Sequence, residues 1–132
     1  MSATITAPVA VVLSAEIGVN DQIGYWLSST GHRTAAARSG YAARRLIVAG
    51  ETRLLITDRV LPPWPGLDTI VSLKQTFAGL MVAFLGDGVA DTRQLALSAG
   101  ADLILPRPLR RADVLQAMHM AGPARRRLEC AS

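Results

Sequence analysis

Three charged residues come shortly after apolar segments, where side chains that do chemistry are often placed. Asp58 directly follows one apolar segment, Glu16 comes soon after another, and Arg107 comes soon after a third. Carboxylate oxygens bind hard divalent cations, and a guanidinium binds carboxylates and phosphates through a planar fork of N–H donors. If the three segments are parallel strands of one sheet, these groups lie at its carboxyl edge, where such sheets bind ligands. The pattern therefore predicts a metal-binding or anion-binding site.

The elements that must position these residues follow from hydrophobic periodicity and from the glycines and prolines between them. The pattern alternates strand and helix five times. The predicted strands are 9–13, 32–38, 53–57, 80–85 and 102–105, and the predicted helices are 21–30, 39–48, 67–77, 91–99 and a last one striped by Val114, Leu115 and Met118. We expect Ser39 and Asp91 to cap helices at their N-termini, and Gly31 to end the first helix.

Five strand–helix units with helical crossovers predict one α/β fold. We expect a five-stranded parallel sheet, doubly wound, with helices on both faces in a three-layer sandwich. A chain of 132 residues fits a single domain with one core. We assign residues 1–122 to this domain and expect residues 123–132 to form a basic, disordered tail. The same edge of the sheet then brings together strand-end residues, namely Ser14, Ala15, Glu16, Asp58, Leu85 and Arg107.

Two segments resemble the receiver domain of bacterial response regulators, a flavodoxin-like, CheY-like fold. The first is LLITDRVLPPWPG, residues 54–66, and the second is AGADLILPRP, residues 99–108. In that family the aspartate after the third strand accepts a phosphoryl group from a histidine kinase, which Asp58 would match. The family also uses an acidic pair that holds magnesium, a hydroxyl after the fourth strand, a lysine after the fifth strand and an aromatic switch residue.

The metal-binding half of the family pattern is incomplete in this sequence. Ser14 and Ala15 stand at the positions of the acidic pair, and Glu16 is the remaining acid beside them. Glu16 and Asp58 are therefore weak candidates for a magnesium site, and the resemblance predicts no resident metal. Glu16 is as well explained as an acid at the start of a helix.

The phosphate-binding half of the pattern is altered as well. Leu85 occupies the hydroxyl position and is best explained by packing, and Ile104 occupies the aromatic switch position. Arg107 replaces the lysine, and we expect it to pair with Asp58, because a strand-end carboxylate without a metal needs a cation. Trp64 lies between prolines and is interpreted either as a lid over the site or as an exposed contact for a partner.

The resemblance implies a stand-alone, atypical receiver in bacterial two-component (phosphorelay) signalling, which binds proteins and is impaired in magnesium-dependent phosphorylation. Its partner would be a histidine kinase or another signalling protein, and a homodimer is left open. One alternative is a receiver phosphorylated at Asp58 with Glu16 and Arg107 in a reduced site, which alone would call for magnesium as a cofactor. We expect no enzyme, because the sequence has no Gly-rich phosphate loop after the first strand and no nucleophile–base pair.

The formal net charge of +4 comes almost entirely from arginine, which raises a third hypothesis of a basic nucleic-acid-binding protein. We disfavour it because no aromatic residue is interleaved with the arginine clusters as a stacking platform. No apolar run approaches the roughly 18 residues of a membrane span. A single cysteine, Cys130, excludes an internal disulfide, and the cytoplasm is the expected compartment.

Overall fold

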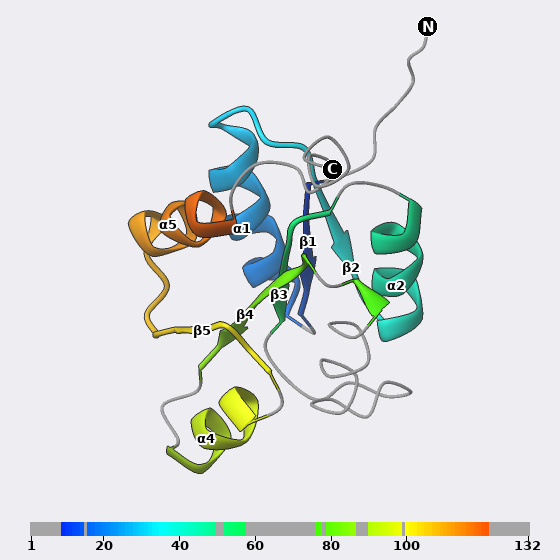
Figure 1. Cartoon of the computed structure of the whole chain (residues 1–132). Helices are drawn as coiled ribbons and strands as arrows, with labels where there is room; N and C mark the ends of the chain where they lie inside the picture. The colour runs from blue at the N-terminus through cyan, green and yellow to red at the C-terminus, as the bar shows by residue number, and fades with distance from the viewer. Residues whose placement is uncertain are drawn as a thin grey trace, which may run out of the picture.

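The computed structural model describes residues 9–14, 16–49, 52–57, 76–77, 79–86, 90–98 and 100–121. Its strands are β1 (Ala10–Leu13), β2 (Thr34–Ala37), β3 (Leu54–Thr57), β4 (Met81–Leu85) and β5 (Leu103–Leu105). Its helices are α1 (Ile17–Ser28), α2 (Gly40–Ala49), α4 (Ala90–Ser98) and α5 (Arg111–Ala121). The strands form one sheet in the order β2-β1-β3-β4-β5, and every neighbouring pair is parallel (Figure 1). The predicted doubly wound parallel sheet is thus confirmed.

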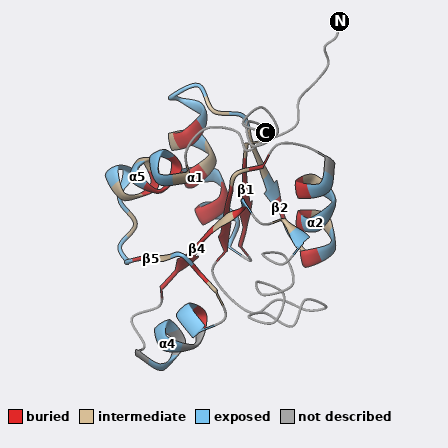
Figure 2. Ribbon diagram, in the orientation of Figure 1, coloured by how far each residue is buried: buried red, intermediate tan, exposed pale blue. Residues whose placement is uncertain are grey.

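Successive strand residues point to opposite faces of the sheet and divide the core into two layers. On one face, Val11, Leu55 and Val82 pack with buried residues of α2 and α4. On the other face, Val12 and Ile56 pack with buried residues of α1 and α5. Figure 2 shows the central strands buried between these helices, as expected of a three-layer sandwich.

The central strands of the sheet are buried along almost their whole length, which explains why their sequences are so apolar. All residues of β1 (AVVL) and β3 (LLIT) are buried, as are four of the five residues of β4. A strand covered on both faces by helices must be apolar throughout rather than alternating. Each fully buried Leu or Ile side chain contributes about 1.5–3 kcal/mol relative to solvent exposure. The edge strand β2 (TAAA) is less buried and carries small side chains.

Two predicted helix boundaries are confirmed in detail. The backbone N–H of Ala42 donates to Ser39 Oγ at 3.1 Å, so Ser39 does cap α2. Gly31, just beyond α1, has a φ of +88°, a conformation that glycine adopts without steric cost. The chain can therefore reverse there and enter β2.

Two other boundaries were predicted incorrectly. Helix α1 begins at Ile17, four residues before the predicted start, because Val19 and Asn20 are buried against the core and outweigh the low helix propensity of Gly18 and Asn20. Helix α4 begins at Ala90, so Asp91 lies inside its first turn and is not the N-cap. Most of the predicted helix 67–77 and the predicted tail 123–132 lie outside the described residues.

None of the described helices combines the length and the apolar character that a membrane span needs.

Candidate functional site

The strand order places a topological switch point at the carboxyl ends of β1 and β3. The chain leaves β1 into α1 on one face of the sheet, whereas α2 covers the other face (Figure 1). Open α/β sheets bind ligands in the crevice that this divergence creates. Ser14, Glu16, Gly86 and Arg107 follow strands at this edge. The predicted site residues Ala15, Asp58 and Trp64 lie outside the described residues.

Ser14, the first residue after β1, is part of the backbone framework of the turn into α1. It is 1% exposed, and its hydroxyl accepts a hydrogen bond from the backbone N–H of Glu16 at 3.0 Å. Its carbonyl oxygen accepts a second one from Nδ2 of Asn20 at 3.1 Å. The side chain at the first acidic-pair position is therefore a buried, neutral hydroxyl.

Glu16 directly precedes α1 at the N-cap position, but its carboxylate does not cap the helix. Its backbone is extended (φ −96°, ψ 114°), and its side chain makes no capping hydrogen bond. Instead, Oε1 lies 3.8 Å from Nη1 of Arg107. The Glu16 side chain is 52% exposed, so this ion pair contributes about 0–1 kcal/mol. Neither role predicted for Glu16 includes this pairing.

Arg107 connects the loop after β5 to the end of β4. Its Nε–H donates to the carbonyl oxygen of Gly86 at 2.9 Å, and the backbone N–H of Gly86 donates to the carbonyl oxygen of Leu105, also at 2.9 Å. The peptide bond between Arg107 and Pro108 is cis. The expected pairing of Arg107 with Asp58 lies outside the described residues. The sequence analysis did not predict the contacts of Arg107 with Glu16 and Gly86. The opposite charge of Glu16, at the same edge of the sheet, could have indicated the first of them.

The two predicted switch positions lie on opposite faces of the sheet. Leu85 is fully buried and belongs to the core layer under α1 and α5. Ile104 is partly buried and packs against the layer under α2 and α4. A Cβ placed on Gly86 would lie 3.0 Å from Cγ2 of Ile104, so the isoleucine methyl already fills the space beside the end of β4.

The sequence matches no protein-family model and no curated protein. The fold is similar to the receiver domain of NtrX from Brucella abortus, with a TM-score of 0.77, 24% identity and coverage of 85% of this chain and 96% of that one. It is also similar to a response regulator receiver domain protein from Clostridium thermocellum (TM-score 0.75, 24% identity, coverage 93% and 98%) and to the chemotaxis response regulator CheY4 of Vibrio cholerae (0.73, 15%, 85% and 96%).

The chain has the CheY-like receiver fold. On this fold, Ser14, Glu16 and Arg107 follow β1 and β5 at the carboxyl edge of the sheet, where the strand pattern predicted them. The described residues contain no cluster of three or more histidine, cysteine or acidic side chains that could hold a metal. Of the described groups at this edge, only Glu16 offers a carboxylate, and it faces a guanidinium. This donor set does not fit a magnesium ion, which prefers several oxygen ligands in octahedral geometry.

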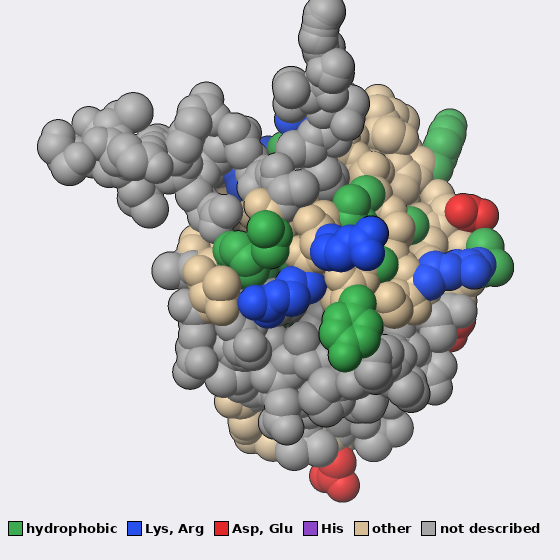
Figure 3. All heavy atoms as spheres, turned by 90° about the vertical axis from the view of Figure 1, so that its right-hand side faces the viewer, with side chains coloured by type: hydrophobic (Ala, Val, Ile, Leu, Met, Phe, Trp, Pro, Cys, Tyr) green, Lys and Arg blue, Asp and Glu red, His purple; other side chains and the backbone are tan. Residues whose placement is uncertain are grey.

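Two arginines that are adjacent in the sequence lie on α2 beside exposed hydrophobic side chains. Arg44 and Arg45 lie on the exposed face of α2 with Tyr41 and Val48, which are 68% and 60% exposed. Figure 3 shows basic and hydrophobic side chains next to one another on this side of the molecule. The arginines of α2 are thus accompanied by one exposed aromatic residue, Tyr41.

Proposed function

We propose that this chain is an atypical receiver in bacterial two-component signalling. It binds a histidine kinase or another signalling protein in the cytoplasm and catalyses no reaction of its own. Its magnesium-dependent phosphorylation at Asp58 is impaired. The receiver fold supports the role in two-component signalling. The buried, neutral environment of Ser14 supports the impaired phosphorylation.

The observation that carries the proposal is the buried hydroxyl at the end of β1. Phosphoryl transfer to a carboxylate requires cations that offset the charge on the transferred group. Ser14 is 1% exposed and its oxygens accept hydrogen bonds from Glu16 and Asn20, so it is neutral and already used in the turn. The remaining acid, Glu16, is turned toward Arg107. The described residues at this edge of the sheet therefore include no pair of carboxylates that could hold magnesium.

Arg107 supports an interaction role that does not depend on a metal. Its guanidinium supplies a fixed positive charge at the carboxyl edge, and its Nε bond to Gly86 holds the side chain in place. Such an arrangement keeps a constant positive charge at this edge of the sheet, because a guanidinium stays protonated in proteins. A partner would then recognise a constant surface rather than one that changes on phosphorylation.

The alternative is a receiver that still accepts phosphate at Asp58. The exposure of Arg107 and Glu16, 36% and 52%, favours it, because both side chains remain accessible to a ligand at this edge. A guanidinium can bind two phosphoryl oxygens at once. In this case Arg107 would take over part of the charge compensation that a metal supplies in other receivers.

Treatment with acetyl phosphate, followed by intact-protein mass spectrometry, distinguishes the two. We expect no magnesium-dependent phosphoryl adduct on the wild-type chain. The double variant Ser14→Asp, Ala15→Asp should gain one, and an aspartate at position 14 can still accept the N–H of Glu16. Adding Asp58→Asn to that variant is the matched control and should remove the adduct. A magnesium-dependent adduct on Asp58 of the wild type would contradict the proposal and establish the alternative.

A further inference from the structure

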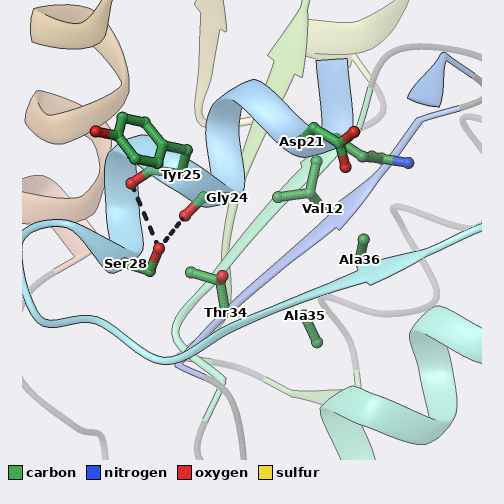
Figure 4. A pocket seen from close by; sticks show the side chains of 9 residues that line it. Val12, Asp21, Gly24, Tyr25, Ser28, Thr34, Ala35 and Ala36 are labelled. Atoms are coloured by element: carbon green, nitrogen blue, oxygen red, sulfur yellow. Dashed lines mark hydrogen bonds between the residues drawn. The ribbon is translucent and has the colours of Figure 1, made fainter. Parts of the chain in front are cut away.

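Two surfaces flank the edge strand β2, and they differ in how far their chemistry specifies a ligand. Against α1 lies a pocket of about 310 Å³, lined by Asp21, Gly24 and Tyr25 of α1 and by Thr34 and Ala36 of β2, among others (Figure 4). The hydroxyls of Tyr25 and Thr34 can donate or accept hydrogen bonds, and Asp21 is the only charged side chain among the described lining residues. The pocket therefore selects no class of ligand. Helix α2 covers the other face of the sheet, and its outer surface is more specific.

The outer surface of α2 carries a row of exposed side chains, here called the α2 stripe, which consists of Tyr41, Arg44, Arg45 and Val48 (Figure 3). Their spacing of i, i+3, i+4 and i+7 places them along one side of the helix. The opposite side holds α2 on the sheet, because Ala43 and Ile47 are at most 1% exposed and belong to the core. The α2 stripe is therefore not needed for packing within the chain.

Positive charge accumulates around the α2 stripe without a compensating carboxylate. Residues 22–48 contain four arginines, Arg33, Arg38, Arg44 and Arg45, and no aspartate or glutamate. Helix α2 contacts β1 and β2, whose sequences AVVL and TAAA carry no charge. No carboxylate of the described residues forms an ion pair with Arg38, Arg44 or Arg45. The surface is thus electrostatically complementary to an acidic partner.

We propose that the α2 stripe binds an acidic helix of another signalling protein. The spacing of the stripe is that of a helix–helix seam, in which residues i, i+3 or i+4, and i+7 face the partner helix. Tyr41 and Val48 lie about 10.5 Å apart along the helix axis and would contact apolar side chains of the partner. Arg44 and Arg45 lie between them and would bind carboxylates through charge-assisted hydrogen bonds. The proposed interaction rests on the role in signalling proposed above, but none of its residues belongs to the site at the carboxyl edge.

Two other occupants fit the α2 stripe less well. Nucleic acid phosphates would pair with the arginines but would leave Val48 without an apolar contact. Helix α1 of a second copy offers exposed Ile17 and Tyr25, but Asp21 is the only carboxylate between them, whereas the stripe presents two guanidinium groups. A separate acidic helix can supply both carboxylates and both apolar contacts.

Fluorescence anisotropy of a fluorescein-labelled helical peptide tests the charged half of the proposal. The peptide has three heptads, with Leu at every a position, Glu at every d and e position, and Ala and Gln elsewhere. We expect saturable binding that weakens as salt is added, because exposed charges are screened. The variant Arg44→Gln, Arg45→Gln should weaken binding about tenfold through loss of two exposed ion pairs. The matched control is Arg110→Gln, Arg111→Gln, an adjacent exposed pair before and at the start of α5, and it should leave binding unchanged.

A second pair of variants tests the apolar half. Tyr41→Ala, Val48→Ala should weaken binding at least tenfold although every charge is retained, because both apolar contacts are lost. Met120→Ala, at a residue of α5 that is 53% exposed, is the control and should have no effect. Circular dichroism verifies that each variant is folded, and amide shifts of the ¹⁵N-labelled chain should centre on residues 41–48.

Several results would overturn the proposal. These are no saturable binding of the Glu peptide, equal binding of a peptide with Gln in place of Glu, or an equal loss in the Arg110, Arg111 control. Duplex DNA that binds as tightly as the peptide and is lost with Arg44 and Arg45 would identify a nucleic-acid surface instead. A wild-type dimer in sedimentation that the same variant dissociates would identify a second copy. A magnesium-dependent adduct on wild-type Asp58 would contradict the impaired phosphorylation but leave the peptide result unaffected, so the two failures are distinguishable.

Discussion

Arg107 donates a hydrogen bond from Nε to the carbonyl oxygen of Gly86 at 2.9 Å, and this bond joins the loop after β5 to the end of the neighbouring strand β4. Lysine carries a CH₂ group at the position of Nε, so it cannot donate this bond. An arginine rather than a lysine at this position therefore changes the structure as well as the reach of the charge.

Arg107→Ala should lower the free energy of unfolding by about 0.5–1.5 kcal/mol, the usual contribution of one hydrogen bond. Arg107→Lys retains the charge but not Nε–H, so we expect it to recover little of the loss. Urea unfolding measures both. Arg110→Ala, at an exposed position of the same loop, is the control and should stay within about 0.5 kcal/mol of wild type. Full recovery of stability by lysine would show that charge, not the bond to Gly86, is what matters.

The predicted pairing of Arg107 with Asp58 is tested by a double-mutant cycle. Asp58→Asn should be neutral or destabilising by about 0–2 kcal/mol, and the double variant with Arg107→Ala should cost less than the sum of the two. The exposed Glu16–Arg107 pair is the comparison, with an expected coupling of about 0–0.5 kcal/mol. Clear stabilisation by Asp58→Asn with additive effects would rule the pairing out, and would indicate an acidic pocket that awaits a cation.

Magnesium binding is tested by tryptophan fluorescence. Trp64 lies close to Asp58 in sequence, and Trp26 is a partly buried residue of α1. We expect no saturable change at physiological magnesium concentrations, because Ser14 and Ala15 supply no carboxylate. The variant Ser14→Asp, Ala15→Asp serves as the positive control and should respond. A saturable quench in the wild type would favour the phosphorylatable receiver.

The close approach of Ile104 to Gly86 predicts a steric penalty at the end of β4. In Gly86→Ala the new Cβ would lie 3.0 Å from Ile104 Cγ2 and 3.5 Å from the carbonyl oxygen of Leu105. We expect a loss of about 1–3 kcal/mol, typical of overpacking. The cost should shrink in an Ile104→Ala background, which removes Cγ2. Gly18→Ala, with nothing within 4 Å, is the matched control and should be neutral or stabilising in thermal unfolding. An equal cost of Gly86→Ala in both backgrounds would place the strain elsewhere.

The sequence alone determined the architecture of the sheet. The runs AVVL and LLI are apolar at every position, a pattern typical of strands that helices cover on both faces. The order of strands and helices then leaves few topologies, because parallel crossovers are right-handed and short. Ser39 could also be assigned as a helix cap, because its hydroxyl bonds to Ala42, only three residues away in the chain.

The tertiary structure decided which side chains meet. Glu16 and Arg107 are far apart in the sequence, and their 3.8 Å approach depends on the orientation of two loops that no local pattern encodes. The early start of α1 likewise depends on the burial of Val19 and Asn20 against the sheet, which overrides the weak local helix propensity of Gly18. The pocket beside β2 likewise depends on which residues of α1 and β2 face each other in the folded chain. Periodicity determines which face of an element is buried, whereas contacts between distant residues depend on how the folded elements are placed in space.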